Sequence, residues 1–369
     1  MQAAVDRHYM ARALALAVRG LGRTHPNPPV GAVVVRRGKI IGEGFHRKAG
    51  TAHAEIVALR AAGRRAAGAT LYVTLEPCTH FGRTPPCLDS VLAARVARVV
   101  IGIRDPNPRV RGRGIAALEK AGVAVTVGTL AAECREVTAG YLSWMERGRP
   151  LVVLKLAASL DGRIATASGA ARWITGAAAR RRAHELRNRL DAIMVGAGTV
   201  RTDDPELTCR LRGGRDPIRV VVTASLGVPR RARLLRSGSG APTWIVTTTD
   251  APRRAEAALA RAGASVIRLP GRGRLRVGAV LRELGRRGVT SVLVEGGASL
   301  AAELIRAGLV DRLVLFLAPI LLGGDGIPLV GSLGARHPTT ALRLRGMRME
   351  RIGQDLVVEA TLPLPRVAL

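Results

Sequence analysis

Short apolar runs alternate with helix-like segments along almost the whole 369-residue chain. Residues 30–46 read as two strands joined by a turn at Arg37-Gly38, and residues 54–66 read as a helix. The alternation continues to residue 128 and resumes after residue 150. Such a pattern predicts layered α/β structure, because a sheet of this kind buries its apolar faces against helices.

A break in the alternation near residues 140–150 predicts two domains. The helical segment that ends near Gly148 is followed by Arg149-Pro150, a dipeptide that disfavours continued helix. A new strand begins directly afterwards. Six further strand-like segments lie at residues 190–200, 217–226, 241–249, 264–270, 289–297 and 311–321. The chain is long enough for two separate cores, and we expect domains at residues 1–147 and 148–369.

Composition narrows the class of protein. Hydrophobic residues make up 47% of the chain, which is typical of a globular protein. Its apolar runs are shorter than the roughly 18–20 residues that cross a bilayer, and the N-terminal segment lacks the pattern of a signal peptide. Four cysteines are too few for a disulfide scaffold in a chain of this length. We expect a cytoplasmic protein with no membrane partner.

The net charge of +31 raises the question of nucleic-acid binding. Only four of the 58 basic residues are lysine, and the arginines are spread over the whole chain. This distribution favours a compositional bias with a solvated basic surface. Aromatic residues make up only 2%, so stacking platforms for single strands are scarce. An arginine-rich surface would still attract small phosphorylated molecules.

Four residues in the first half have the chemistry and spacing of a catalytic zinc site. His53 offers an imidazole nitrogen and Cys78 and Cys87 offer thiolates, and a catalytic zinc site uses three protein ligands and one water. Two thiolates would balance the charge of the ion, so that the water could lose a proton near neutral pH. Glu55 can reach this water only if a helix begins beside His53, because positions i and i+2 of a helix point in different directions.

Each cysteine follows a proline, Pro77 or Pro86. Proline is favoured in the first turn of a helix, and a helix N-terminus stabilises a thiolate. His-x-Glu alone would indicate only a capped helix with a surface histidine. A structural zinc site is an alternative, but it would need a fourth protein ligand, for which His80 is the spare candidate. Together the residues favour zinc-dependent deamination, in which the glutamate transfers protons and is not a ligand.

Three motifs together resemble the deaminase half of the bifunctional deaminase/reductase family of riboflavin biosynthesis. They are THPNPPVGAVVV, GEGFH and EPCTHFGRTPPC, the last with eight residues between the cysteines instead of the usual two. The resemblance implies a cytidine-deaminase-like, three-layer α/β domain in which Asn27 hydrogen-bonds the pyrimidine. It also implies that His46 and the loop His80–Pro85 line the pocket. Within that loop, Arg83 would meet a substrate phosphate; singly, Asn27 reads as a turn residue and Arg83 as a solvated charge.

Motifs of the second half continue the resemblance in order along nearly the whole chain. They are KLAASLDGRIA, ASGAARWITG, VGAGTVRTDDPELTCR and VLVEGGASLAAELI. The last joins an apolar strand to a helix through two glycines, a turn at which backbone N–H groups can approach a phosphate. The Gly-Ala-Gly at residues 196–198 lacks the full dinucleotide fingerprint. The resemblance implies a dihydrofolate-reductase-like domain that binds NADPH.

The resemblance implies two sets of binding residues in this half. Those that would contact NADPH are Ala157, Trp173, Thr199, Asp203, Gly297, Ala298, Ser299, Leu300, Ala301, Ala302 and Glu303. Those that would contact the phosphoribosyl substrate are Lys155, Ala171, Arg187, Leu207, Arg210 and Glu295. Guanidinium groups pair bidentately with phosphate, which supports the two arginines. Lysine is costly to bury unpaired, so we expect Lys155 to face Asp161 or the substrate.

Some of these residues have a simpler interpretation, and two segments depart from the family pattern. Trp173 could be an ordinary core residue, and Asp203 could be a helix cap or turn residue. Ala170-Ala171 stands where the family often has polar residues, and Thr223-Ala224 stands where it often has Asp-Ser. The first departure removes a side-chain contact with substrate and the second weakens one cofactor contact. Neither removes the reaction.

The resemblance implies two successive reactions. In the first, water activated by Zn²⁺ deaminates 2,5-diamino-6-(5-phosphoribosylamino)pyrimidin-4-one while Glu55 transfers protons. In the second, hydride from NADPH reduces the ribosyl chain of 5-amino-6-(5-phosphoribosylamino)uracil to ribityl. We therefore expect phosphorylated pyrimidines as partners, no nucleic acid, and a homo-oligomer. A tRNA or single-strand deaminase, which the charge suggests, agrees less well with the cysteine spacing and the second nucleotide-binding half.

Overall fold

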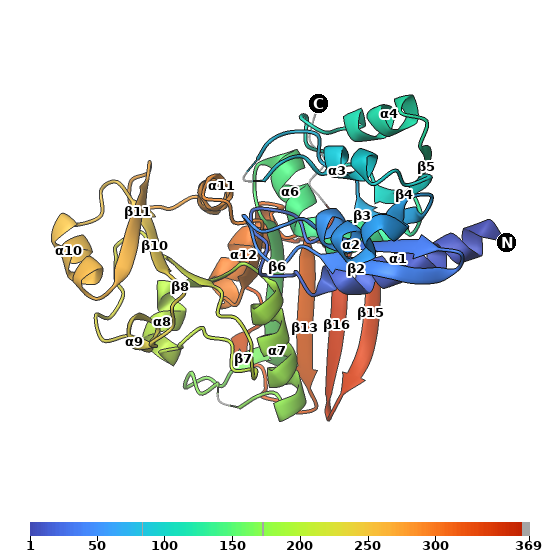
Figure 1. Cartoon of the computed structure of the whole chain (residues 1–369). Coiled ribbons are helices and arrows are strands. Elements are labelled where there is room, and N and C mark those ends of the chain that lie inside the picture. The colour runs from blue at the N-terminus through green and yellow to red at the C-terminus, as the bar shows by residue number, and fades with distance from the viewer. Residues whose placement is uncertain (83, 172, 364–369) are drawn as a thin grey trace. The chain divides into compact units, whose positions relative to one another are not determined.

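The computed structural model describes residues 1–82, 84–171 and 173–363. The chain forms two compact units, Met1–Gly148 and a second that begins at Arg149 (Figure 1). Within the described residues, none of the helices combines the length and the apolar character needed to span a bilayer.

The first unit contains a five-stranded sheet in the order β2-β1-β3-β4-β5. Its strands are β1 Gly31–Arg36, β2 Lys39–Phe45, β3 Thr70–Leu75, β4 Arg98–Ile103 and β5 Ala124–Val127. The predicted hairpin of β1 and β2 is confirmed, and Arg37 and Gly38 both have positive φ, as a two-residue hairpin turn requires. Strands β3, β4 and β5 are parallel, so their carboxyl ends share one edge of the sheet.

Six helices accompany this sheet. They are α1 Gln2–Val18, α2 Ala54–Ala62, α3 Cys87–Ala93, α4 Arg113–Lys120, α5 Ala131–Val137 and α6 Ala139–Arg147, and a 3₁₀ turn at Gly63–Ala66 follows α2. Two glycines show that α1 and α2 cover opposite faces. A Cβ on Gly31 would lie 2.0 Å from the carbonyl of Ala13 in α1, and one on Gly44 would lie 2.4 Å from the carbonyl of Ala54 in α2. Gly31 pairs with Phe45, the neighbour of Gly44, and adjacent residues of a strand face opposite sides. The predicted three-layer arrangement is confirmed.

A buried polar group connects α1 to the sheet. The carboxylate of Asp6 accepts hydrogen bonds from Nη1 and Nη2 of Arg98, at 2.9 and 2.7 Å, and from the hydroxyl of Tyr72 at 2.9 Å. Burial by itself would raise the pKa of Asp6, but the bonds from Arg98, Gln2 and Tyr72 outweigh it and lower the pKa below its ordinary value. Asp6 is therefore ionised in the folded protein at neutral pH.

The second unit contains a nine-stranded sheet in the order β11-β10-β9-β8-β12-β6-β13-β16-β15. Its strands are β6 Leu151–Ser159, β8 Ala192–Gly196, β9 Ile218–Val222, β10 Thr243–Thr248, β11 Ala264–Leu269, β12 Ser291–Val294, β13 Arg312–Ala318, β15 Arg345–Ile352 and β16 Asp355–Thr361. Strands β6 and β8 to β13 are parallel, and β16 and β15 are antiparallel to their neighbours. A separate pair comprises β7 Arg163–Ala165 and β14 Ile327–Pro328. The chain runs outward from β8 to β11 and returns at β12, so the strand order reverses between β8 and β12, where open α/β sheets bind ligands.

The helices of the second unit connect these strands. They are α7 Ala177–Arg189, α8 Ala197–Asp203, α9 Arg233–Arg236, α10 Arg253–Arg261, α11 Val277–Arg286 and α12 Ala298–Arg306, with a 3₁₀ turn at Pro338–Thr340. Residues 197–200, predicted as the end of a strand, begin α8 instead, because Gly196 ends the strand and caps the helix. The hairpin of β15 and β16 was not predicted. Strand β15 mixes arginines and methionines, and its side chains are almost all exposed, so its sequence has no alternation of buried and exposed positions. Figure 1 shows the two strands side by side at the end of the sheet.

Candidate active sites

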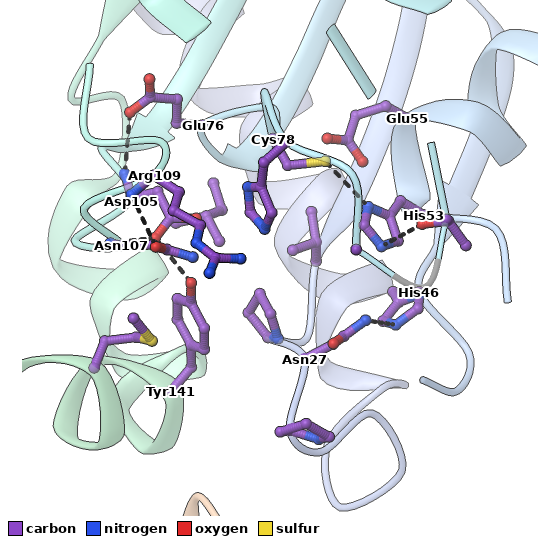
Figure 2. Close-up of a pocket in the computed structure, with 18 of the residues that line it drawn as sticks. Asn27, His46, His53, Glu55, Glu76, Cys78, Asp105, Asn107, Arg109 and Tyr141 are labelled. Atoms are coloured by element: carbon purple, nitrogen blue, oxygen red, sulfur yellow. Dashed lines mark hydrogen bonds between the residues drawn. The ribbon is translucent and has the colours of Figure 1, made fainter. Parts of the chain in front are cut away.

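The three predicted zinc ligands lie together in the first unit. His53 is the residue before α2, Cys78 follows β3, and Cys87 is the first residue of α3. Their ligand atoms all lie within 4.8 Å of one another. Nδ1 of His53 is 3.0 Å from Sγ of Cys87. It is 3.6 Å from Sγ of Cys78 (Figure 2). One imidazole nitrogen and two sulfurs are a donor set that suits zinc and leaves a fourth position for water.

The start of α2 places Glu55 beside this cluster. The helix begins at Ala54, so His53 lies before its first turn and Glu55 lies within it. The prediction that a helix begins beside His53 is therefore confirmed. Glu55 is buried, and burial raises the pKa of its carboxyl to about 7.

The two cysteines are held differently. Cys87 is the first residue of α3, as expected from the proline before it. Cys78 also follows a proline but lies in irregular structure between β3 and α3, and not at a helix start. The backbone N–H of Cys87 donates to Sγ of Cys78 at 3.3 Å. Hydrogen bonds from the thiol of Cys87 and from His53 lower the pKa of Cys78 to about 4. The cluster therefore stabilises a thiolate, the form in which cysteine binds metal.

A cavity of about 370 Å³ adjoins the cluster. Its lining includes the predicted residues Asn27, His46, His53, Glu55 and Cys78. His80, Gly82 and Thr84 of the loop between the cysteines also line it. The remaining predicted substrate residue of this half, Arg83, lies outside the described residues.

A chain of hydrogen bonds sets the orientation of Asn27. Nδ1 of His46 lies 3.2 Å from the carbonyl oxygen of Ala52, which can only accept, so Nδ1 carries the hydrogen. Nε2 of His46 is then the acceptor for Nδ2 of Asn27 at 3.1 Å. Burial lowers the pKa of His46, in agreement with a neutral ring. The carbonyl oxygen of Asn27 therefore points away from His46 and is an acceptor for a ligand (Figure 2).

In the second unit, Arg187 and Glu295 form an ion pair whose side chains are 12% and 13% exposed. Nε and Nη2 of Arg187 donate to the two carboxylate oxygens of Glu295, both at 2.8 Å, and Nη1 donates to the carbonyl of Thr208 at 2.9 Å. Burial would raise the pKa of Glu295, but Arg187 and then Lys155 lower it to about 2. The three predicted substrate residues therefore form one charged group, with Lys155 in the middle of β6, Glu295 directly after β12 and Arg187 on α7.

The alternative partner proposed for Lys155 has other contacts. Asp161 accepts hydrogen bonds from the hydroxyl of Ser159 and from the backbone N–H groups of Leu322 and Gly323. Burial lowers the pKa of Lys155, and the carboxylate that opposes this shift is Glu295. The pairing of Lys155 with Asp161 is therefore wrong, and Glu295 takes that place.

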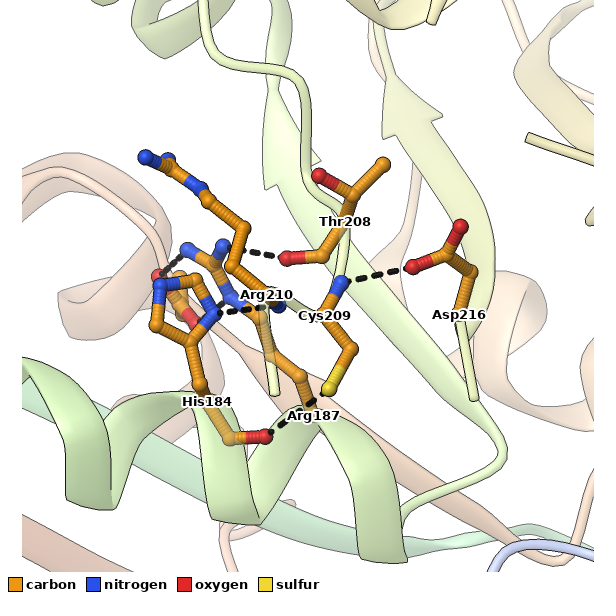
Figure 3. A network of polar contacts seen from close by, with 7 residues as sticks. His184, Arg187, Thr208, Cys209, Arg210 and Asp216 are labelled. Atoms are coloured by element: carbon orange, nitrogen blue, oxygen red, sulfur yellow. Dashed lines mark hydrogen bonds and ion pairs between the residues drawn. The ribbon is translucent and has the colours of Figure 1, made fainter. Parts of the chain in front are cut away.

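The segment from Leu207 to Arg210 lies beside α7. The backbone N–H of Arg210 donates to Nδ1 of His184 at 3.3 Å, and that of Cys209 donates to the carboxylate of Asp216 at 2.7 Å (Figure 3). Leu207 is buried, whereas the side chain of Arg210 is exposed. Arg210 thus has a fixed backbone and a side chain that is free to meet a charged ligand.

The residues expected to contact NADPH lie mainly where neighbouring parallel strands end. Ala157 is in β6, Thr199 follows β8 and Gly297 follows β12, and these three strands are adjacent. Gly297 is the N-cap of α12, so the predicted strand, double glycine and helix are confirmed. A Cβ on Gly297 would lie 3.9 Å from the hydroxyl of Thr199. The N-terminus of α12 and the start of α8 therefore border the same space.

Three other predicted residues lie farther along these elements. Asp203 is the last residue of α8, and Ala171 and Trp173 lie in the segment before α7. Trp173 is 68% exposed, and the guanidinium of Arg180 lies 4.6 Å from its ring centroid. The alternative that Trp173 is a core residue is therefore wrong.

Comparison with known proteins agrees with this geometry. Residues 3–103 match the family model described as the cytidine and deoxycytidylate deaminase zinc-binding region, and residues 150–358 match the RibD C-terminal domain. The riboflavin biosynthesis protein RibD of Aquifex aeolicus (strain VF5) is 42% identical over 355 residues, which cover 96% of this chain and 98% of the relative. The chain belongs to the RibD family. RibD of Escherichia coli (strain K12) is also 42% identical, over 95% of this chain and 98% of its own.

Solved RibD structures have the same architecture. Acinetobacter baumannii RibD, form 1, has a TM-score of 0.88 and 36% identity, and covers 98% of this chain and 99% of its own. The diaminohydroxyphosphoribosylaminopyrimidine deaminase/5-amino-6-(5-phosphoribosylamino)uracil reductase of Thermotoga maritima has a TM-score of 0.86 and 35% identity, and covers 98% of this chain and 100% of its own. The predicted family and fold class are confirmed.

Membership of the RibD family establishes the activity. The protein is a bifunctional deaminase and reductase of riboflavin biosynthesis, with a zinc-binding deaminase domain and a reductase domain that uses NADPH. Its substrates are small phosphorylated pyrimidines. The predicted enzyme class and cofactors are thereby confirmed.

One wall of the RibD deaminase cavity was not predicted. It contains Asp105, Asn107 and Arg109 from the loop after β4, and Tyr141, Trp144 and Met145 from α6. Asp105 accepts hydrogen bonds from the backbone of Asn107 at 2.8 Å and from Tyr141 at 2.9 Å, and burial raises its pKa to about 6. The loop sequence DPNP was a usable signal, because β3 and β4 are parallel neighbours and their following loops meet at one edge. The sequence of α6 has no such signal.

The side chain of Glu76 anchors the loop that follows β4. Its carboxylate accepts hydrogen bonds from four backbone N–H groups, those of Asp105, Gly112, Gly114 and Ile115. Glu76 is buried, so these bonds replace its hydration and hold the loop and the start of α4 against the end of β3.

Proposed function

We propose that residues 1–147 carry out the deamination and residues 148–369 the reduction. The first substrate is 2,5-diamino-6-(5-phosphoribosylamino)pyrimidin-4-one and the second is 5-amino-6-(5-phosphoribosylamino)uracil, the compound named for the Thermotoga maritima relative. The observation that carries the proposal is the position of His53, Glu55 and Cys78 in the wall of a cavity whose volume, about 370 Å³, suits a small ligand. Cys87 completes the ligand cluster, whose ligand atoms all lie within 4.8 Å of one another.

In the deaminase site, His53, Cys78 and Cys87 would hold zinc, whose chemistry when bound is to lower the pKa of a water that attacks the ring carbon. Glu55 would accept one proton of the attacking water and pass it to the ring nitrogen as the C–O bond forms. It would then carry the proton of the new hydroxyl to the amino group, which leaves as ammonia as the C–N bond breaks and the carbonyl forms. Its burial favours this role, since a carboxyl in an apolar site takes up a proton more readily. The oxygen of Asn27 accepts from an N–H group of the pyrimidine, and His46 holds Asn27 in that orientation.

In the reductase site, we assign Lys155, Arg187 and Glu295 to the phosphoribosyl substrate. The Arg187–Glu295 pair is rigid because both carboxylate oxygens are bonded, so it offers fixed donors and acceptors to the opened sugar. Leu207 forms the adjacent wall, Arg210 meets the phosphate, and Ala171 lies beside the sugar. NADPH supplies the hydride when bound.

The N-terminal turn of α12 is assigned to the phosphates of NADPH. A helix N-terminus offers unbonded N–H groups and a partial positive charge to an anion. We assign Thr199, Asp203 and Ala157 to the same cofactor, because a Cβ on Gly297 would lie 3.9 Å from the hydroxyl of Thr199. Trp173 is exposed and available to cover the cofactor.

We further propose a cytoplasmic homo-oligomer. Among the described residues, strand β15 pairs on one side only, and Met347 and Met349 on it are 58% and 66% exposed. An edge strand offers backbone N–H and C=O groups to a second strand, the two exposed methionines add apolar contact, and closed symmetric pairs are the commonest oligomers. The cytoplasm is favoured because the substrates and NADPH are phosphorylated and charged.

One reaction tests the two-step assignment. The full chain is mixed with the diaminopyrimidine phosphate and NADPH, and ammonia and NADPH are followed together, with a zinc-stripped sample alongside. We expect ammonia first and NADPH loss after it, and neither signal in the stripped sample. Restored NADPH loss when the stripped sample receives the deaminated compound would separate the two sites. NADPH loss before ammonia, or ammonia release without zinc, contradicts the assignment.

A further inference from the structure

The deaminase cavity has a single arginine in its described lining. Of the described residues that border it, Arg109 is the one lysine or arginine, and it lies in the loop that follows β4. The zinc cluster, by contrast, is built from the starts of α2 and α3 and the end of β3. Figure 2 shows the guanidinium of Arg109 directed into the cavity from the side opposite His53 and Glu55.

The backbone of Arg109 is anchored on both sides. Its N–H donates to the side-chain oxygen of Asn107 at 3.0 Å, and its carbonyl accepts from the hydroxyl of Thr79 at 2.9 Å. The N–H of Asn107 in turn donates to Asp105 at 2.8 Å. The Cα of Arg109 is therefore fixed relative to the cavity, and only the side chain remains to be ordered by a ligand.

The charge of Arg109 is not neutralised within the described part of the chain, where no carboxylate forms an ion pair with it. The two nearby acids in the cavity lining have other partners. Asp105 is bonded to Asn107 and Tyr141, and Glu76 is bonded to four backbone N–H groups. A guanidinium that faces a cavity without a carboxylate partner is suited to bidentate binding of an oxyanion.

The shape of the substrate connects these observations. If the amino-bearing carbon C2 reaches the zinc cluster and Glu55, the phosphoribosylamino arm leaves the ring at C6, two positions away, and its length carries the phosphate away from the cluster. Its phosphate is the only full anionic charge of the molecule and lies at the end of that arm. We propose that Arg109 binds this phosphate and so selects phosphorylated pyrimidines, an inference that rests on the deamination proposed above.

The test compares two substrates in the zinc-loaded full chain. Ammonia release is measured with the diaminopyrimidine phosphate and with the same compound lacking the phosphate, for the wild type, Arg109→Gln and Arg109→Lys. Arg104→Gln is the matched control, because Arg104 is an exposed arginine of the same segment and does not line the cavity. Zinc content and turnover of the dephosphorylated substrate report whether each variant is folded.

We expect Arg109→Gln to raise KM for the phosphorylated substrate about 10- to 100-fold, the range for loss of a charged hydrogen-bonding pair. Its kcat and its KM for the dephosphorylated compound should stay near those of the wild type. Arg109→Lys should recover part of the loss, since lysine keeps the charge but not the fork of donors. Arg104→Gln should behave as the wild type.

Other outcomes overturn the inference. An unchanged KM, or an equal increase with both substrates, would show that Arg109 has no role or contacts the ring instead. If the wild type releases no ammonia from either compound, the proposed deamination fails, and binding of inorganic phosphate to the wild type and Arg109→Gln then decides about Arg109 alone. Equal phosphate affinity of the two proteins contradicts the inference.

Discussion

The side-chain amide of Asn27 donates to Nε2 of His46 at 3.1 Å, and the other ring nitrogen of His46 lies 3.2 Å from the carbonyl of Ala52. Each bond in this series fixes the direction of the next. The ring must carry its hydrogen on Nδ1, so Asn27 must present its oxygen to the cavity. His46 therefore acts on a ligand through Asn27.

A double-mutant cycle tests this relationship. Asn27→Ala should lower kcat/KM for ammonia release about tenfold, as expected for one lost hydrogen bond to the substrate. His46→Ala should have a smaller or equal effect, and the double variant should match Asn27→Ala alone, because His46 has nothing left to orient. Additive losses would show that His46 contacts the substrate independently. Reduction of the deaminated compound by NADPH serves as the control and should not change.

The Arg187–Glu295 pair should be costly to break from one side. Arg187→Met leaves a mostly desolvated carboxylate without its main partner, and Glu295→Leu leaves a mostly desolvated guanidinium, so each should lower the free energy of unfolding by up to about 3–5 kcal/mol. The double variant R187M/E295L should recover part of this loss, because both charges are gone. All three should lose NADPH oxidation and keep ammonia release. A double variant as unstable as the sum of the singles would contradict the pairing, and denaturant unfolding provides the measurement.

Zinc content should depend on Cys87 and not on Cys209. Cys87→Ser removes one of three converging ligands and should lower bound zinc well below about one ion per chain. Cys209→Ser is the control, because Cys209 lies in the second unit and serine retains its hydrogen bond to the carbonyl of His184. Metal analysis of the purified proteins decides. Full zinc occupancy in Cys87→Ser would remove that residue from the ligand set.

Asp6 should make the stability of the first unit depend on pH in the acid range. Its pKa is lowered in the folded state, so ionised Asp6 stabilises the fold above the ordinary carboxyl pKa and this stabilisation is lost as the pH falls through the lower, folded value. Between about pH 5 and pH 3 the wild type should therefore lose more stability than Asp6→Asn. Thermal unfolding at several pH values measures this. Parallel curves for the two proteins would show that Asp6 does not titrate on unfolding.

The parts of the sites that could be predicted from sequence depend on short stretches of chain. His53 and Glu55 are two residues apart, and a single helix start determines how both side chains point. The double glycine at Gly296 and Gly297 likewise determines its own turn and the start of α12. In each case the geometry is fixed by neighbours in sequence, so the pattern is visible there.

The parts that could not be predicted depend on packing between distant segments. Arg109 reaches the zinc cavity because β3 and β4 are adjacent and parallel, and Tyr141 reaches it because α6 packs beside the same edge. Glu295, and not Asp161, opposes Lys155 because β12 lies next to β6. Nothing in the local sequence of these residues encodes which strand becomes the neighbour.

The division of the two activities is tested most directly by Glu55→Gln in the full chain. Ammonia and NADPH are followed with the diamino substrate and, separately, with the deaminated compound. The account predicts a protein that retains zinc, releases no ammonia, leaves NADPH unused with the diamino substrate, and oxidises NADPH at the wild-type rate with the deaminated compound. Wild-type ammonia release, or loss of NADPH oxidation with the deaminated compound, would contradict it.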